Sequence, residues 1–169
     1  MSLINNKKLY VITSIIIIVG VFYVGYLRAV APTSNSNGSA KTGVLENGAI
    51  KNYKTIQIGR ATIQAELATT EAQQVQGLSG RTSLATSTGM LFVFDRADKW
   101  GIWMKDMNFP IDVLWIDSNL KVNYIVENMT PASYPTTYWP QTPASYVLEI
   151  PVGTIKSDGI SVGQSVVLK

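Results

Sequence analysis

Residues 111–127 read IDVLWIDSNLKVNYIVE, and this stretch decides the fold class. An apolar run over 111–116 ends in the turn-forming residues 117–119, and the run over 121–127 then alternates apolar and polar side chains. An apolar run and a period-two run around a short polar turn predict a β-hairpin. We therefore expect a β-rich domain built outward from this hairpin.

The sequence on both sides repeats this pattern of short runs and tight turns. Residues 53–58 and 61–67 predict a second hairpin, and further strands are expected at 90–94, 100–104, 145–150 and 165–169. A short helix, TEAQQVQ, is expected after a cap at Thr69 or Thr70, and one helical turn at 153–158. The predicted fold is α+β and β-rich: a compact, mostly antiparallel, barrel-like or sandwich domain with one or two short helices.

A proline-rich loop over 128–143 separates two of these strands. Its four prolines exclude a helix or a central strand. Long irregular loops in compact domains tend to be functional, and this one carries Tyr134, Tyr138 and Trp139. Stiff aromatic side chains can hold a glycan or a protein partner, and the alternative is a lid over the open end of the barrel.

The amino-terminal region predicts a membrane anchor. Residues 9–27, LYVITSIIIIVGVFYVGYL, carry no charge and are long enough to span a bilayer. The basic residues of the 1–8 segment indicate a cytoplasmic amino terminus, followed by a flexible linker over 28–52 and an extracytoplasmic domain over 53–169. The alternative is a signal peptide cleaved after Ala31, which Pro32 and the length of the apolar run disfavour.

Composition excludes several classes of function. The 169 residues include no His and no Cys, which rules out a Ser-His-Asp triad, a thiol nucleophile, disulfides and thiolate zinc sites. Residues 1–52 hold five basic residues and one acidic residue, whereas 53–169 hold nine basic and ten acidic. The domain therefore has no basic excess, and we expect no nucleic-acid partner.

Four separated motifs resemble one family, the domain of unknown function 192. They are Gly77-Leu78 with Arg81 and Ser83-Leu84; Gly89-Met90-Leu91-Phe92-Val93-Phe94; Trp103-Met104-Lys105 with Pro110, Asp112 and Asp117; and Tyr146-Val147-Leu148-Glu149 with Gly153, Gly159-Ile160 and Gly163. The resemblance spans about 61–168 and implies a compact β-rich fold, often behind a signal peptide or a membrane anchor, with no established reaction.

Two carboxyl groups are candidates for a site. Asp112 shares a strand face with Leu114 and Ile116, so it must be paired, hydrogen-bonded or protonated. Such a group could orient a ligand, or it could be structural, binding loop N–H groups or Arg81. Glu149 alternates away from the apolar stripe of its strand, and together with Asp112 it could serve a carboxylate-dependent hydrolase.

Further candidates surround them. Trp103 and Lys105 alternate onto one face, where an aromatic ring and a cation could hold a sugar or an anion, and the alternatives are core packing and a solvated lysine. Arg81 could bind a carboxylate or phosphate, or tie its loop to the sheet through Asp112 or Glu149. The full ligand-binding prediction is Arg81, Trp103, Lys105, Asp112, Tyr138, Trp139 and Glu149.

No cofactor is predicted, and the spacing of the acidic residues matches no calcium loop. The leading hypothesis is a membrane-anchored extracytoplasmic module that binds a small polar or glycan-like envelope ligand. The alternatives are an interaction or scaffold component of an envelope complex, with a protein partner on the 128–143 loop, and the carboxylate-dependent hydrolase.

Overall fold

The computed structural model describes residues 43–46 and 49–169. The predicted anchor over 9–27 and most of the predicted linker lie outside these residues. Within the described part, no helix has both the length and the apolar character needed to cross a membrane. The first strand and the start of the second fall inside the stretch predicted as a linker, so regular structure begins before residue 53.

The described part is a β-rich α+β domain. Its elements are β1 Gly43–Glu46, β2 Ala49–Ile58, β3 Ala61–Ala68, α2 Glu71–Gln76, β4 Thr88–Asp98, β5 Ile102–Trp103, β6 Ile111–Ile116, β7 Val122–Met129, the 3-10 turn η1 Pro131–Ser133, β8 Thr137–Tyr138, β9 Ala144–Pro151, α3 Thr154–Asp158 and β10 Val166–Leu168. Both predicted hairpins, β2–β3 and β6–β7, are present.

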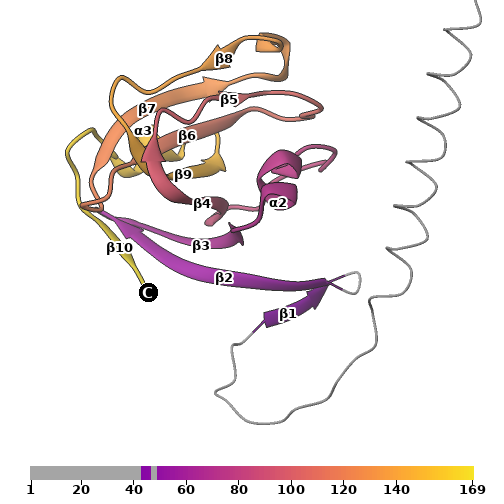
Figure 1. The fold of residues 1–169 in the computed structure, drawn as a ribbon, viewed down its shortest axis with the longest axis horizontal. Coiled ribbons are helices and arrows are strands. Elements are labelled where there is room, and N and C mark those ends of the chain that lie inside the picture. Colours follow the sequence, from indigo (N-terminus) through magenta and orange to yellow (C-terminus); the bar gives the residue numbers. More distant parts are fainter. Residues whose placement is uncertain (1–42, 47–48) are drawn as a thin grey trace, which may run out of the picture. The chain divides into compact units, whose positions relative to one another are not determined.

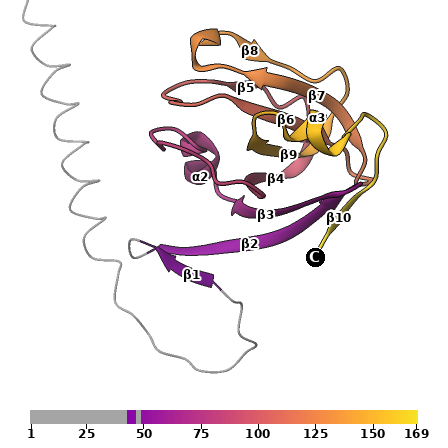
Figure 2. The same cartoon turned by 180° about the vertical axis from the view of Figure 1, so that it is seen from behind.

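Eight strands form one sheet curled into a half-barrel (Figures 1 and 2), in the order β1-β2-β3-β4-β9-β6-β7, with β10 beside β2. The pairs are antiparallel as expected, except that β3 and β4 run parallel. That exception exists because 88–98 returns to the sheet after α2 and a loop rather than after a tight turn. Strand β9 pairs with β4 on one side and with β6 on the other.

The segment that includes β10 bridges two strands that the main order leaves apart. On one side Val166–Leu168 pairs with Ile56–Ile58 of β2. On the other side the Val166 N–H donates to the Leu120 carbonyl, and Val122 exchanges backbone hydrogen bonds with Gly163 and Gln164. Figure 1 shows this yellow segment running beside β2 to the carboxyl terminus. It links the start of β7 to β2 and narrows the opening of the curled sheet.

The two faces of the sheet carry separate cores. On one face, residues such as Leu91, Leu114 and Leu148 pack with Ile155 of α3. On the other face, Phe92, Val113, Trp115 and Val147 lie beneath Leu78, Ile102 and Met104, which come from the segments after α2 and around β5. Because β-strand side chains alternate between faces, the position of each residue in its strand decides which core it joins.

Some elements differ from the prediction. Strand β4 continues through the charged residues 95–98, and β5 is only two residues long because Met104 turns inward and Asp106, with φ of 55°, reverses the chain. The proline-rich loop holds the η1 turn and the two-residue β8, which pairs with β5 in a sheet of its own. The loop is therefore tied down beside β5.

Candidate functional site

Glu149 is a buried acidic side chain whose pKa is strongly raised. It lies in β9 on the face of Val147, as its alternation predicted, and only 5% of it is exposed. Its Oε2 atom is buried and has no hydrogen-bond partner. Burial raises the pKa of this carboxyl from 4.5 to about 8, while the nearby positive charge of Arg81 lowers it. Glu149 is thus a neutral acid at pH 7 that still has an unused hydrogen-bonding group.

A small pocket of about 70 Å³ reaches Glu149. Its walls come from α2 and the following turn (Gln74 to Ser79), from Phe92 of β4, from residues 101–103 around β5, and from Met107. No Lys or Arg lines it, and Glu149 is its one carboxyl group. The pocket therefore places a single acidic group inside a wall of apolar and amide side chains.

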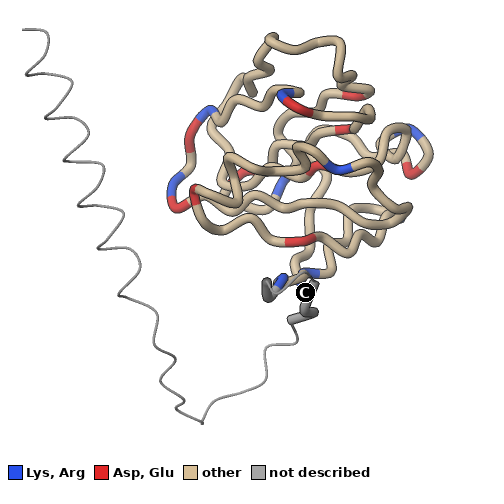
Figure 3. Tube along the Cα trace, turned by 90° about the vertical axis from the view of Figure 1, so that its right-hand side faces the viewer, with Lys and Arg blue, Asp and Glu red and all other residues tan. Residues whose placement is uncertain are grey.

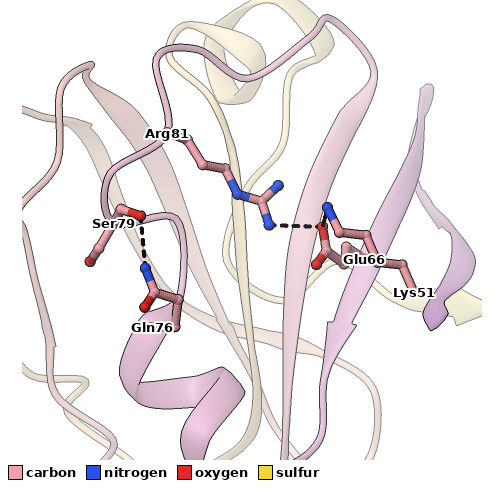
Figure 4. A network of polar contacts seen from close by, with 5 residues as sticks. All are labelled: Lys51, Glu66, Gln76, Ser79 and Arg81. Atoms are coloured by element: carbon pink, nitrogen blue, oxygen red, sulfur yellow. Dashed lines mark hydrogen bonds and ion pairs between the residues drawn. The ribbon is translucent and has the colours of Figure 1, made fainter. Parts of the chain in front are cut away.

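The wall formed by α2 is held by local hydrogen bonds. Thr70 and Gln73 form a capping box at its amino end, confirming the predicted cap. Gly77, with φ of 49°, ends the helix, and an added Cβ there would lie 3.3 Å from the Phe92 ring. The Gln76 amide donates to the Ser79 carbonyl (Figure 4), and the Ser79 hydroxyl donates to the Lys105 carbonyl. The turn over the pocket is therefore fixed to both α2 and the loop after β5.

An apolar groove of about 270 Å³ adjoins this pocket and shares Gln74, Val75, Phe92 and residues 101–103 with it. Phe94 and Trp100 line its far part with stacked rings, whose centroids are 4.0 Å apart. Trp103 at the junction is 51% exposed, so the alternative assignment of this tryptophan to the core is wrong. Aromatic and apolar surface thus continues outward from the Glu149 pocket.

The proline-rich loop packs against the same edge through β8. Ile102 pairs with Tyr138, and the Trp103 ring meets the Tyr134 ring edge-on with centroids 6.0 Å apart. Gly101 permits this approach, because a Cβ there would lie 2.7 Å from both Trp139 and Thr137. Tyr138 is half-buried against the core and Trp139 is exposed. The two loop residues predicted to bind a ligand therefore flank β5 rather than line the pocket.

Arg81 has a different partner from those predicted. Its guanidinium binds Glu66 Oε2 at 2.8 Å, and the same oxygen lies 3.3 Å from the Lys51 ammonium (Figure 4). Neither Asp112 nor Glu149 forms an ion pair with it, because the β3 register brings Glu66 under the loop that carries Arg81. These residues line a separate open groove of about 540 Å³ beside the 80–88 loop.

Asp112 is buried on the opposite face from Glu149, in the core that includes Ile155. Its two oxygens accept hydrogen bonds from the Asn128 N–H at 2.9 Å and the Ile155 N–H at 3.0 Å. The structural alternative expected loop N–H groups or Arg81, whereas the two donors belong to β7 and α3. The carboxylate ties the end of β7 to the start of α3.

Lys105 projects into solvent and lies 3.6 Å from Asp106. Because β5 ends at Trp103, Lys105 lies outside the strand, and the two residues do not share a strand face as predicted. Of the seven predicted residues, the pocket brings together only Glu149 and Trp103. Sequence reasoning missed Gln74, Leu78 and Ile102 as its walls, although Leu78 belongs to one of the four family motifs.

Among the described residues, the distribution of charge outside the pocket indicates no second site. Lys and Arg are interspersed with Asp and Glu along the domain (Figure 3). Across the described residues, no cluster of three or more potential metal-ligating side chains occurs. The electrostatic feature that stands apart is therefore the buried Glu149 carboxyl.

Among the solved structures that resemble this chain are two proteins of similar coverage. One is a protein from Sinorhizobium meliloti 1021, for which a role as a transcription regulator has been suggested; it is 32% identical, with a TM-score of 0.66 over 70% of this chain and 95% of that chain. The other is a protein of unknown function from Novosphingobium aromaticivorans DSM 12444, 27% identical, with a TM-score of 0.66 over 79% of this chain and 99% of that chain.

A search of curated proteins returned no match. The model of the DUF192 family, described as uncharacterized ACR, matches residues 54–168, which is nearly the span over which the sequence motifs resemble it. The motifs, the curled sheet and the family match agree, and the chain belongs to the DUF192 family.

Proposed function

We propose that this protein is a membrane-anchored extracytoplasmic module that binds a small polar or glycan-like ligand in the Glu149 pocket. The observation that carries the proposal is the buried Oε2 of Glu149, which has no hydrogen-bond partner although Glu149 is one of the residues that line a pocket. A buried polar atom without a hydrogen bond costs about 1–3 kcal/mol. A ligand that supplies the missing hydrogen bond recovers this free energy on binding.

The surroundings of the carboxyl favour binding over catalysis. A glycoside hydrolase of the usual kind needs two carboxyl groups across one cleft. Glu149 is the one carboxyl group of its pocket, and Asp112 lies on the other face of the sheet. The carboxylate pair predicted from the sequence is therefore not assembled, and this correction removes the basis for the hydrolase.

A role as an interaction component has one observation in its favour. Val75, Trp103, Tyr134 and Trp139 are all substantially exposed, and exposed apolar side chains can mark a contact with another protein. The same side chains lie near the mouth of the pocket, on α2, β5 and the proline-rich loop. We therefore keep a protein partner as the second candidate function.

The first test is thermal unfolding of the full chain in detergent with a panel of sugars, amino compounds and small anions. A ligand at a hundred times its Kd adds about 2.7 kcal/mol to the free energy of unfolding. We expect a shift of the melting temperature in the wild type that Glu149→Gln loses. Glu127→Gln, an exposed glutamate of β7, is the matched control and should keep the shift. No shift with any compound contradicts the proposed site.

The location has its own test, because the chain has no native cysteine. Single variants Ser2→Cys and Lys99→Cys can be treated in intact cells with a maleimide that does not cross membranes. A cytoplasmic amino terminus and an extracytoplasmic domain require labelling at position 99 and none at position 2. The reverse pattern, or labelling at neither position, contradicts the proposed topology.

A further inference from the structure

We propose that the Glu149 pocket takes a primary ammonium group carried on a slender apolar body, so that the ligand class is an alkyl or arylalkyl amine. This inference rests on the proposed function and specifies the chemistry of the same site. It follows from three properties of the pocket: its size, the charges around it, and the apolar groove that continues from it.

The size of the pocket limits what can reach Glu149. Its volume is about 70 Å³, against about 270 Å³ for the adjoining groove. A narrow end group, such as an ammonium with its first methylene, therefore suits the pocket, and a bulkier part of a ligand suits the groove. The remaining part of any ligand must then lie outside the pocket.

The charged residues in and around the pocket favour a positively charged ligand group over a negatively charged one. The one charged or titratable group of the lining is an acid, with no Lys or Arg among the lining residues. Arg81, the nearest base that acts on Glu149, is engaged by Glu66 in the neighbouring groove. An entering ammonium would pair with the Glu149 carboxylate, whose proton passes to solvent, and it would donate the hydrogen bond that Oε2 lacks.

The adjoining groove suits the rest of such a ligand. It offers the Phe94–Trp100 stack and Trp103, with Glu71 as its one charged lining residue. A cation already lies on this aromatic surface, since the Arg96 guanidinium is 5.7 Å from the centre of the Trp100 ring and also pairs with Asp98. An anionic ligand would meet the Glu71 carboxylate and no Lys or Arg in either lining.

The test compares three ligands of one shape: butylammonium, butanol and butyrate. Each is titrated into the detergent-solubilised full chain, with tryptophan fluorescence and thermal unfolding as readouts. All four tryptophans lie in the described domain, and Trp103 lines the pocket. We expect butylammonium to bind at least tenfold more tightly than butanol, and butyrate not to bind. Calorimetry at pH 7 in two buffers of different ionisation enthalpy should show about one proton released per butylammonium bound.

Variants separate the pocket from non-specific binding. Glu149→Gln should remove the preference for butylammonium over butanol, whereas Glu127→Gln should keep it. Trp103→Ala, at an exposed position, should weaken butylammonium and butanol together. Equal or tighter binding of butanol or butyrate by the wild type overturns the amine class but leaves the proposed function standing. If no compound of the earlier panel binds either, both proposals fail.

A second arm distinguishes a free amine from a lysine side chain of a protein. Nα-acetyl-lysine N-methylamide carries the same butylammonium group on a peptide backbone. Binding of this compound at least as tight as that of butylammonium identifies a protein lysine as the natural source of the group. Binding at least tenfold weaker identifies a free amine, and both results require the same ammonium in the pocket.

Discussion

Asp112 and Glu149 lie on adjacent, hydrogen-bonded strands, yet their side chains project to opposite faces of the sheet. Asp112 stands across from Ile150, and Glu149 stands across from Val113. The two buried carboxyls consequently have different surroundings: Asp112 accepts two backbone hydrogen bonds, whereas Oε2 of Glu149 has no partner. Burial with full hydrogen bonding is typical of a structural group, and burial beside a pocket without a partner is typical of a binding group.

Glu149 should make the protein less stable as the pH rises. Its pKa is 4.5 in the unfolded chain and about 8 in the folded one, so unfolding releases a proton between these values. The contribution of this group to stability is present below pH 4.5 and is lost as the pH rises towards 8, by about 1.4 kcal/mol per pH unit. Urea unfolding of the full chain at pH 5, 6, 7 and 8 measures this slope.

Glu149→Gln is the control for the change of unfolding free energy with pH, since an amide of the same shape does not titrate. The variant should show a shallower loss of stability with pH than the wild type, and Glu127→Gln should follow the wild type. Identical slopes for Glu149→Gln and the wild type would mean that the Glu149 carboxyl is ionised in the folded protein.

In the Arg81→Gln variant, the loss of stability caused by Glu149 should continue to higher pH. The positive charge of Arg81 lowers the pKa of Glu149, so its removal should raise this pKa further above its ordinary value. The substitution also breaks the ion pair with Glu66, which reduces stability wherever Glu66 is ionised. We expect the pH-dependent loss to continue beyond pH 8 in the variant. A carboxyl carbon titration by NMR measures the pKa directly, and an unchanged value contradicts the coupling.

Asp112→Asn should loosen the junction between β7 and α3. One acceptor oxygen becomes an NH₂ group that faces a backbone N–H, so we expect a loss of about 2–4 kcal/mol of unfolding free energy. Hydrogen exchange should quicken at Asn128 and Ile155. Asp117→Asn is the comparison, because Asp117 accepts its two backbone hydrogen bonds, from Asn119 and Lys121, on the single atom Oδ1, and an asparagine keeps such an oxygen. An equal loss in both variants would contradict the need for two acceptor oxygens at Asp112.

Gly89→Ala should be strongly destabilising, because an added Cβ would lie 2.6 Å from the carbonyl oxygen of Glu149 and 3.1 Å from Ile63. The obstacle is backbone of the neighbouring strand, so we expect a loss of about 3 kcal/mol. Gly80→Ala is the comparison: it has φ of 76° but open space around it, and should lose about 1 kcal/mol. Denaturant unfolding that ranks the two variants the other way would contradict the close approach of β4 and β9.

Local sequence signals predicted the local structure well. Period-two alternation gave the β2–β3 and β6–β7 hairpins, and Thr70 with Gly77 bounded α2. The alternation of Glu149 away from Leu148 also placed it on the correct face. Each of these features depends on residues that are close in sequence, where side-chain chemistry and backbone geometry act directly.

The candidate site was less predictable, because it depends on pairing between distant strands. In the β6–β9 pair, Glu149 stands across from Val113 rather than Asp112, so the two carboxyl groups lie on opposite faces of the sheet. No pattern of residues close in sequence specifies this register. The partner of Arg81 is Glu66 for the same reason, since β3 and β4 are joined in parallel across α2 and a loop. For Trp103, the sequence left ligand binding and core packing as two alternatives, because the exposure of its side chain depends on where β5 ends.

The bridge made by β10 has a consequence for how the domain is synthesised. Residues 163–168 connect β7 to β2, so these two strands are linked only after residue 168 has been made. Contacts this distant in sequence form slowly, and residues 56–58 of β2, which β10 covers, remain an open strand edge until then. Cotranslational folding can proceed through local hairpins, but the hydrogen bonds that link β7 to β2 through residues 163–168 form only after these residues have been made. A partner that covers the free edge of β2 during that interval would protect the nascent chain from aggregation.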